Sequence, residues 1–195
     1  MIDLTTLKEW LGISAEDTAH DALLTDLEAR AVEWVERQTG RYFGPPAETT
    51  EVLCGTGARR LWLAEPPVSV AEVVEYAYPG AEGVIIDPAA PDGYEIRTGG
   101  NEGWLVRRGG VWWPGYEYRV RYTRGYPAGQ EPADIRQLVL DLVALKWSIR
   151  GKDGLQSESI GGYSYTRSAF HIADDGDLKS IPGALRTIQS WRRAV

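Results

Sequence analysis

Hydrophobic and polar residues alternate with two different periods along this 195-residue chain. A helical period covers about the first forty residues, a period of two dominates from about residue 49 to 123, and the helical period then returns. Side chains repeat every 3.6 residues in a helix and every two in a strand. We therefore predict an α+β fold, a small helical bundle (long N-terminal and C-terminal helices) with an inserted antiparallel β sheet or partial barrel.

The first zone predicts a short helix over Thr5–Leu11 and a longer one over about Asp17–Thr39. In the longer segment, apolar side chains three and four residues apart fall on one helical face. These side chains are Leu24, Leu27, Ala31 and Val35. Gly40 follows where a residue in the left-handed conformation commonly ends a helix.

The second zone predicts several short strands separated by glycine and proline turns. Two apolar-rich runs, Glu51–Cys54 and Arg60–Leu63, flank Gly55-Thr56-Gly57, and this pattern is typical of a β-hairpin. Tyr116–Tyr122 alternates most regularly, with Tyr116, Tyr118, Val120 and Tyr122 on one face. Further strands are expected at Val68–Tyr78, Gly83–Asp87, Tyr94–Arg97 and Trp104–Arg107.

The third zone predicts a helix from about Glu131 to Ile149, with Pro132 in its first turn. Its apolar side chains form two faces: Ile135, Leu138, Val139, Leu142 and Leu145 on one, and Leu140, Val143, Ala144 and Trp147 on the other. A helix this apolar must be covered on two sides, and we expect another subunit to provide one cover. A long segment without helical pattern follows, and then a short helix over Ala184–Arg193.

These zones predict two domains: a helical core of residues 1–48 and 124–195, and a β-rich insertion of residues 49–123. The composition, 43% hydrophobic and 25% charged, is that of a globular protein. No apolar run approaches the roughly 20 residues that span a bilayer, and the N-terminus lacks the pattern of a signal peptide. The single cysteine, Cys54, rules out an internal disulfide and fits a reducing cytoplasm, and we expect a half-buried strand residue there.

The net charge and the aromatic content limit the classes of function that this protein can have. The net charge of -7 argues against a sequence-independent grip on nucleic acid, but it allows a surface past which DNA slides without sticking. Eight tryptophans and ten tyrosines are many for this length. Because such side chains are costly to leave exposed, they favour interfaces with partners.

The sequence contains no recognisable active-site motif. The chain has no nucleophile-elbow, phosphate-loop or dinucleotide-binding motif, and its histidines, His20 and His171, are expected to be surface or helix-end residues. The acidic run Asp174–Asp177 resembles the start of a calcium loop but lacks the late glutamate, so a solvated loop is favoured and a hydrolase stays a minor hypothesis. Glu72 and Glu75 are assigned to a solvated strand face. We predict no catalytic, cofactor-binding or metal-binding residues and no enzymatic activity.

Two groups of side chains leave alternatives open. Trp62, Trp104, Trp112 and Trp113 all fall in the strand zone. They are assigned mainly to core and interface packing, but stacking on sugar rings makes a carbohydrate- or ligand-binding module the alternative function. Arg119, Arg121 and Arg124 could meet phosphate or the carboxylates of a partner. Because the net charge of the chain is negative, a protein partner or an ordinary solvated face is favoured for these arginines.

The order of short motifs in the third zone points to a known family. Tyr122–Pro127 is followed by Pro132–Ile135, then by the apolar helix and Arg150-Gly151, and then by Ser157–Ser164. This order resembles the head–tail connector (head-completion or adaptor) proteins of tailed bacteriophages. The opening helices, Arg41-Tyr42-Phe43 after Gly40, and the Gly55–Val68 region are also similar. The strand zone from about Tyr78 to Glu117 departs from the compact members of the family.

The resemblance implies a structural neck protein without a cofactor. Such proteins form rings, usually of twelve subunits, beneath the portal protein. They extend the DNA channel and offer a docking surface for stopper or tail-completion proteins. It also implies a location in the virion at the head–tail junction, and in the host cytoplasm before assembly. DNA would pass through the lumen without specific binding.

We expect partner contacts in two places, on the apolar helix and in the segment that follows it. Alternating Tyr, Ser and Thr residues allow that segment to lie extended against a partner, for example by strand addition. The predicted contact residues are Leu140, Val143, Trp147, Arg150, Ser157, Glu158, Ile160, Tyr163 and Tyr165.

Overall fold

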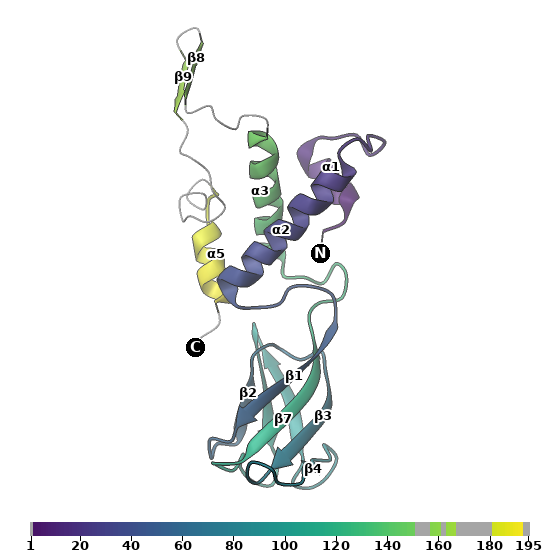
Figure 1. Ribbon diagram of the computed structural model, residues 1–195, viewed down its shortest axis with the longest axis vertical. Coiled ribbons are helices and arrows are strands. Elements are labelled where there is room, and N and C mark those ends of the chain that lie inside the picture. Colours follow the sequence, from purple (N-terminus) through teal and green to yellow (C-terminus); the bar gives the residue numbers. More distant parts are fainter. Residues whose placement is uncertain (1, 151–156, 161–162, 167–180, 193–195) are drawn as a thin grey trace. The chain divides into compact units, whose positions relative to one another are not determined.

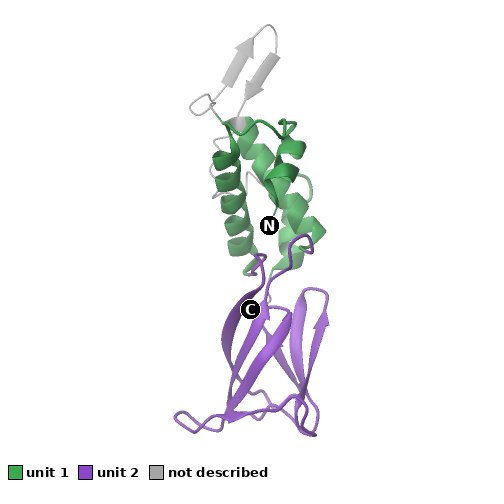
Figure 2. Ribbon diagram, turned by 90° about the vertical axis from the view of Figure 1, so that its right-hand side faces the viewer, with its two compact units in different colours: residues 1–40, 131–194 green, residues 41–130, 195 purple. Residues whose placement is uncertain are grey.

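The computed structural model describes residues 2–150, 157–160, 163–166 and 181–192. The chain divides into two compact units (Figure 2). Unit 1 combines residues 1–40 with 131–194, and unit 2 is formed by residues 41–130. The unit boundaries therefore lie at 40/41 and 130/131, compared with the predicted 48/49 and 123/124.

The described part of unit 1 is helical apart from the strand pair of β8 and β9 (Figure 1). Its elements are α1 (Leu4–Leu11), α2 (Asp21–Thr39), α3 (Ala133–Ile149), β8 (Ser157–Ile160), β9 (Tyr163–Thr166) and α5 (Ala184–Trp191). The Asp3 side chain caps α1 by accepting a hydrogen bond from the backbone N–H of Thr6 at 2.9 Å. The α2 helix starts later than the predicted Asp17, because the Asp17 side chain accepts from the backbone N–H of Ala19 in the turn before it.

The mixture of helices and antiparallel sheets confirms the α+β class, but the lengths of the terminal helices differ from the prediction. The described helices nearest the ends, α1 and α5, have eight residues each. The longer helices, α2 with 19 residues and α3 with 17, are internal. Long helices at the two ends of the chain are therefore not confirmed.

Both apolar faces of α3 contribute buried side chains to the core of unit 1. Leu138 and Val139 on one face and Leu140 and Val143 on the other are all at most 6% exposed. The helices α1, α2 and α5 all contact α3. The prediction that other elements pack on both apolar faces of α3 is right. The helices of its own unit pack there, however, where the prediction placed another subunit.

Unit 2 contains two antiparallel sheets. Its strands are β1 (Ala47–Cys54), β2 (Arg60–Leu63), β3 (Ser69–Tyr76), β4 (Val84–Ile85), β5 (Tyr94–Gly99), β6 (Glu102–Arg107) and β7 (Glu117–Arg124). One sheet has the order β1-β7-β3-β4 and the other the order β2-β6-β5. Side chains from both sheets form one core, so the predicted partial barrel is instead a two-sheet packing. The alternation in β7 is confirmed, because Tyr118, Val120 and Tyr122 are fully buried.

The predicted hairpin between Glu51–Cys54 and Arg60–Leu63 is wrong. The strand β1 pairs with β7, whereas β2 pairs with β6 in the other sheet. The segment between them, which contains Gly55 and Gly57, connects one sheet to the other. The backbone N–H of Gly55 donates to the Tyr116 carbonyl, and the backbone N–H of Gly57 donates to the Trp112 carbonyl. A Cβ on Gly55 would lie 1.9 Å from the carbonyl oxygen of Trp113, so this close approach requires glycine.

Of three residues of unit 2 whose exposure was predicted, two differ from the prediction. Glu72 lies on the outer face of its sheet beside Arg121, as a solvated residue should. Glu75 is three residues further, on the opposite face of β3, and its Cα partner is the buried Tyr118. It is therefore not part of a solvated face. Cys54 ends a strand as predicted but is exposed rather than half-buried.

Candidate interaction surfaces

The predicted contact residues on α3 separate into buried and accessible ones. Leu140 and Val143 are buried in the chain and belong to its core. Trp147 is half-buried at the C-terminal end of α3. The Arg150 guanidinium carbon lies 3.4 Å from the Trp147 ring centre, and the His20 ring contacts Trp147 edge-on at 5.2 Å. His20 precedes α2, a helix-end position as expected.

The remaining predicted contact residues lie on the hairpin of β8 and β9. The register pairs Glu158 with Tyr165 and Ile160 with Tyr163, so the backbone is extended, as the alternation predicts. As described, this sheet has two strands, which makes each of them an edge strand. An edge strand presents unpaired N–H and C=O groups to which another strand can add.

The tryptophans of the strand zone do not form one platform. Trp112 is fully buried, and its indole N–H donates to the Arg59 carbonyl at 3.0 Å. Trp113 is exposed but does not belong to a strand. Only Trp62 and Trp104 are paired, with ring centres 4.9 Å apart and ring planes tilted by 47°. These two rings partly cover each other and differ from the flat platform that would stack on a sugar.

The outer face of the β2-β6-β5 sheet brings basic and aromatic side chains together. Residues opposite each other in an antiparallel ladder share a face. The register therefore forms two rows: Arg60, Val106 and Glu95 in one, and Trp62, Trp104 and Arg97 in the other. We call these six residues the Arg–Trp face. Trp62 is 47% exposed, and the Arg60 guanidinium lies 5.7 Å from the Trp104 ring centre.

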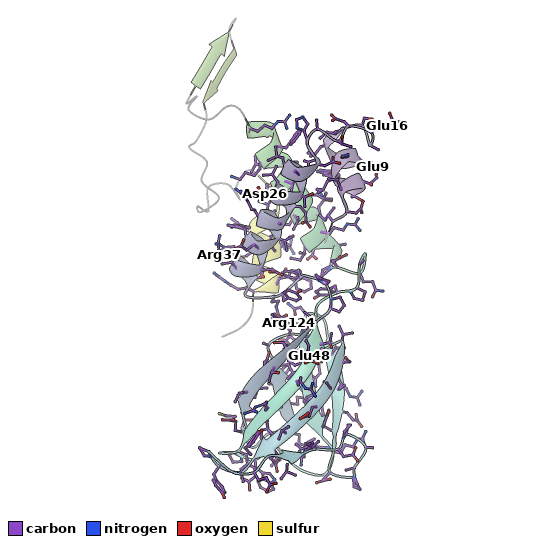
Figure 3. The ribbon with its side chains drawn as sticks, turned by 45° about the vertical axis from the view of Figure 1, so that its right-hand side comes forward. Glu9, Glu16, Asp26, Arg37, Glu48 and Arg124 are labelled. Carbon is purple, nitrogen blue, oxygen red and sulfur yellow. The ribbon has the colours of Figure 1, made fainter. Side chains whose placement is uncertain are left out.

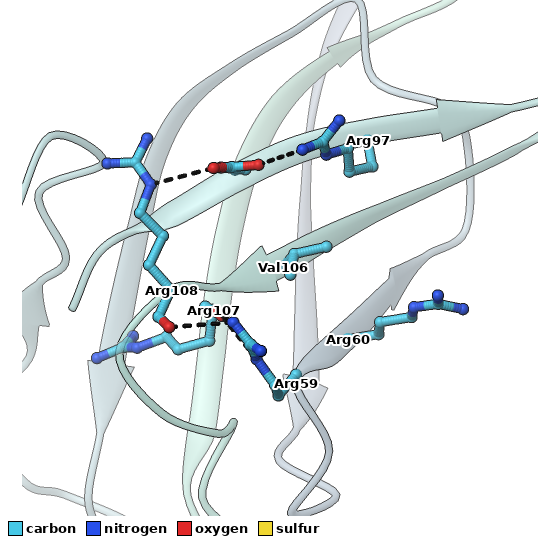
Figure 4. A pocket seen from close by; sticks show the side chains of 7 residues that line it. Arg59, Arg60, Arg97, Val106, Arg107 and Arg108 are labelled. Atoms are coloured by element: carbon cyan, nitrogen blue, oxygen red, sulfur yellow. Dashed lines mark hydrogen bonds and ion pairs between the residues drawn. The ribbon is translucent and has the colours of Figure 1, made fainter. Parts of the chain in front are cut away.

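Four exposed arginines crowd a hollow of about 380 Å³ beside this face (Figure 4). They are Arg59, Arg60, Arg97 and Arg108. The Glu95 carboxylate accepts a hydrogen bond from Arg97 and lies 3.5 Å from Arg108. The Arg97 hydrogen bond and charge, with a smaller effect of Arg108, lower the pKa of Glu95. The hollow therefore presents one carboxylate among these four exposed arginines, and the buried Arg107 also lines it.

The sequence pattern did not predict this basic face. Its residues come from three strands that meet only through pairing between distant segments. The available signal was the alternation of Arg60 with Trp62 and of Trp104 with Val106, which places each pair on one side of its strand.

The arginines of β7, in contrast, have partners within unit 2. Arg121 contacts Glu72 at 3.1 Å and Glu48 at 3.6 Å. Arg119 lies over the Tyr76 ring and Arg124 over the Tyr42 ring, at 5.0 Å and 4.5 Å from the ring centres. This arrangement is that of an ordinary solvated strand face.

The described residues contain no cluster of three or more metal-binding side chains. Two sequence candidates, His171 and the acidic run Asp174–Asp177, lie outside the described residues. In the part of the chain that is described, no helix combines the length and apolar character needed to cross a membrane.

Comparison with known proteins supports the resemblance seen in the sequence. Residues 1–77 match the family model described as Phage gp6-like head-tail connector protein. No curated protein matches the chain by sequence. The predicted resemblance to head–tail connector proteins is therefore confirmed over residues 1–77.

Three of the solved chains that are similar in fold come from particles of one kind. A chain from the neck of an empty gene transfer agent (GTA) particle, computed with C6 symmetry, has a TM-score of 0.62 and 15% identity, and the match covers 100% of this chain and 90% of that chain. A chain from the virion of a native GTA particle has a TM-score of 0.61 and 19% identity, with the same coverage. A chain from the neck of a native GTA particle, computed with C12 symmetry, has a TM-score of 0.58 and 15% identity, with 98% and 88% covered. The matched connector family and the similar neck chains are structural proteins rather than enzymes.

Proposed function

We propose that this chain is a structural subunit of the neck of a phage or phage-like particle and forms a ring at the head–tail junction. The observation that carries the proposal is the similarity in fold of the whole chain to neck chains of GTA particles, together with the connector-family match of residues 1–77. The C12 symmetry of one similar neck favours a ring of twelve subunits.

The proposed partners follow from the position of such a ring. One side binds the portal protein, and the other offers a docking surface for a stopper or tail-completion protein. DNA passes through the lumen, and the net charge of -7 keeps the wall from gripping its phosphates. The subunit is found in the neck of the virion, and in the host cytoplasm before assembly.

The hairpin of β8 and β9 is the proposed contact arm. It begins a few residues beyond the end of α3, and its edge strands suit strand addition to a neighbouring protein. Trp147 and Arg150, in contact at the C-terminal end of α3, precede this arm in the sequence. Leu140 and Val143, which the chain itself buries, hold α3 in place rather than contacting a partner.

Electron microscopy of the chain mixed with the portal protein of the same particle tests the proposal. We expect closed rings of the chain on the portal. A variant with a Gly-Ser linker in place of residues 157–166 should bind more weakly, whereas an Arg37→Ala variant, changed at an exposed residue of α2, should behave as the wild type. Bare portal rings at micromolar chain concentration would reject the ring function.

A further inference from the structure

We infer that the Arg–Trp face binds the acidic surface of residues 1–40 on a second copy of this chain. The inference rests on the proposed ring, because a ring requires each subunit to present two different, complementary surfaces to its neighbours. Beyond the proposed ring, it identifies the two surfaces that contact each other between neighbouring subunits and the chemistry of that contact.

The Arg–Trp face has the composition of an interface centre. Tryptophan and arginine are the residues most enriched where binding energy concentrates. Trp62 is 47% exposed although its ring packs on Trp104, and the Arg60 guanidinium lies over the Trp104 ring. Covering this pair would remove apolar area from water and exclude water from the nearby arginines.

The charge of this face is opposite to that of the chain as a whole. Four exposed arginines and one carboxylate line the adjacent hollow, in a protein with a net charge of -7. Arg59 already donates to the carbonyls of residues 107 and 108, and Glu95 serves both Arg97 and Arg108. One carboxylate does not balance four guanidinium groups, so the face attracts further carboxylates.

Residues 1–40 provide the complementary surface. They contain nine acidic side chains and only three basic ones. Glu9 on α1 and Glu16 in the loop after it are exposed, as is Asp26 on α2 (Figure 3). The same segment exposes two large apolar side chains, Trp10 at 49% and Leu23 at 41%. It therefore offers carboxylates that can pair with the arginines and apolar side chains that can pack on the tryptophan pair of the Arg–Trp face.

Two features favour a protein surface over the phosphates of DNA as the occupant. Glu95 lies among the arginines and would repel a phosphate backbone, whereas a protein surface can place its carboxylates around it. The exposed tryptophan pair packs in a tilted arrangement that suits side chains of irregular shape rather than a duplex backbone. Duplex DNA is therefore the competing outcome of the test.

The test uses the ring assembled on the portal, with the photocrosslinker benzoylphenylalanine in place of Trp62. A matched control carries it in place of Tyr78, which is 65% exposed on unit 2. After irradiation in the presence of duplex DNA, mass spectrometry identifies the attached peptide. We expect position 62, but not position 78, to attach to a peptide from residues 1–40 of another copy.

Charge reversal gives a second readout. The double variant Arg60→Glu, Arg97→Glu should bind into the ring at least about tenfold more weakly, because like charges would then face each other. Adding a second variant, Glu9→Arg with Glu16→Arg, should restore mixed rings. The matched control, Arg119→Glu with Arg121→Glu, changes the same charge on the other sheet and should keep wild-type assembly.

The outcomes separate this inference from the proposed function. Rings that form normally but attach position 62 to another part of the neighbour, to the portal or to DNA overturn the inference and leave the ring function standing. Rings from the Arg60→Glu, Arg97→Glu variant at wild-type concentration also overturn it. If the wild-type chain forms no ring, the proposed function fails and this inference fails with it.

Discussion

The hydroxyl of Tyr122 on β7 donates a hydrogen bond of 2.5 Å to the carboxylate of Glu51 on β1. The same carboxylate accepts from the backbone N–H of Ala64 at 3.1 Å, just after β2 in the other sheet. Glu51 therefore ties the two sheets of unit 2 together. Burial, and then the hydrogen bond to Glu51, raise the pKa of Tyr122 far above its ordinary value.

Replacing Tyr122 with Phe should destabilise unit 2 by about 1–3 kcal/mol, because it removes a buried donor to a charged acceptor while keeping the ring. Chemical denaturation followed by tryptophan fluorescence measures the loss. The matched control is Tyr78→Phe at a 65% exposed position, which should stay within about 0.5 kcal/mol of the wild type. Equal stability of the two variants would show that the Glu51 contact contributes nothing.

Alkaline pH should unfold the strand unit through its buried tyrosines. Burial, and then the neighbouring Glu75 carboxylate, raise the pKa of Tyr118 from 10.0 to about 12. A raised folded-state pKa means that the stabilisation is fully present below pH 10 and is lost as the pH rises towards 12. Denaturation curves across this range, with tyrosinate absorbance as a second signal, measure the effect. A Tyr118→Phe variant should show a weaker pH dependence, and an unchanged slope would contradict the assignment.

The connection between the two sheets should require glycine at position 55. Replacing Gly55 with Ala places a Cβ 1.9 Å from the carbonyl oxygen of Trp113, so the backbone must shift. We expect a loss of at least about 3 kcal/mol in the free energy of unfolding. Gly110→Ala is the control, because its Cβ would meet no atom within 4 Å. Similar thermal stability of both variants would exclude this close approach.

The cap of α1 should contribute to the stability of the helical unit. The backbone N–H of Thr6, and then its hydroxyl, lower the pKa of Asp3 below 3.8. Asp3→Ala should cost about 1 kcal/mol at neutral pH, and Asp3→Asn less, because asparagine also caps. The lowered pKa makes the charged cap's contribution present above pH 3.8 and lost as the pH falls below it. Urea denaturation at neutral and acidic pH checks both statements, with the exposed Glu16→Ala as control. An Asp3→Ala variant as stable as the wild type would contradict them.

Local pattern predicted the elements of this fold better than their pairing. The apolar faces of α3, the alternation of β7 and the glycine end of α2 all follow from neighbouring residues. The hairpin at Gly55–Gly57 failed because β1 and β2 pair with strands far along the chain, and a turn sequence carries no information on such partners.

The contact surfaces were predictable only in part for the same reason. The extended backbone of residues 157–160 and 163–166 follows from the alternation of the sequence there. The packing partner of the second apolar face of α3 was predicted to be another subunit. A sequence does not show how many helices of the same chain pack against a given helix face. The Arg–Trp face could not be predicted, since Arg60 and Arg97 meet across a sheet that forms from non-local pairs.

Native mass spectrometry of the portal ring with the bound chain tests the ring function most directly. It counts how many copies of the 21.6 kDa chain join one portal. We expect a closed complement of twelve copies, in line with the C12 symmetry of a similar neck. A portal that gains no copies, or that gains one or two without ever reaching a closed set, would contradict the assignment of this chain as a ring-forming neck subunit.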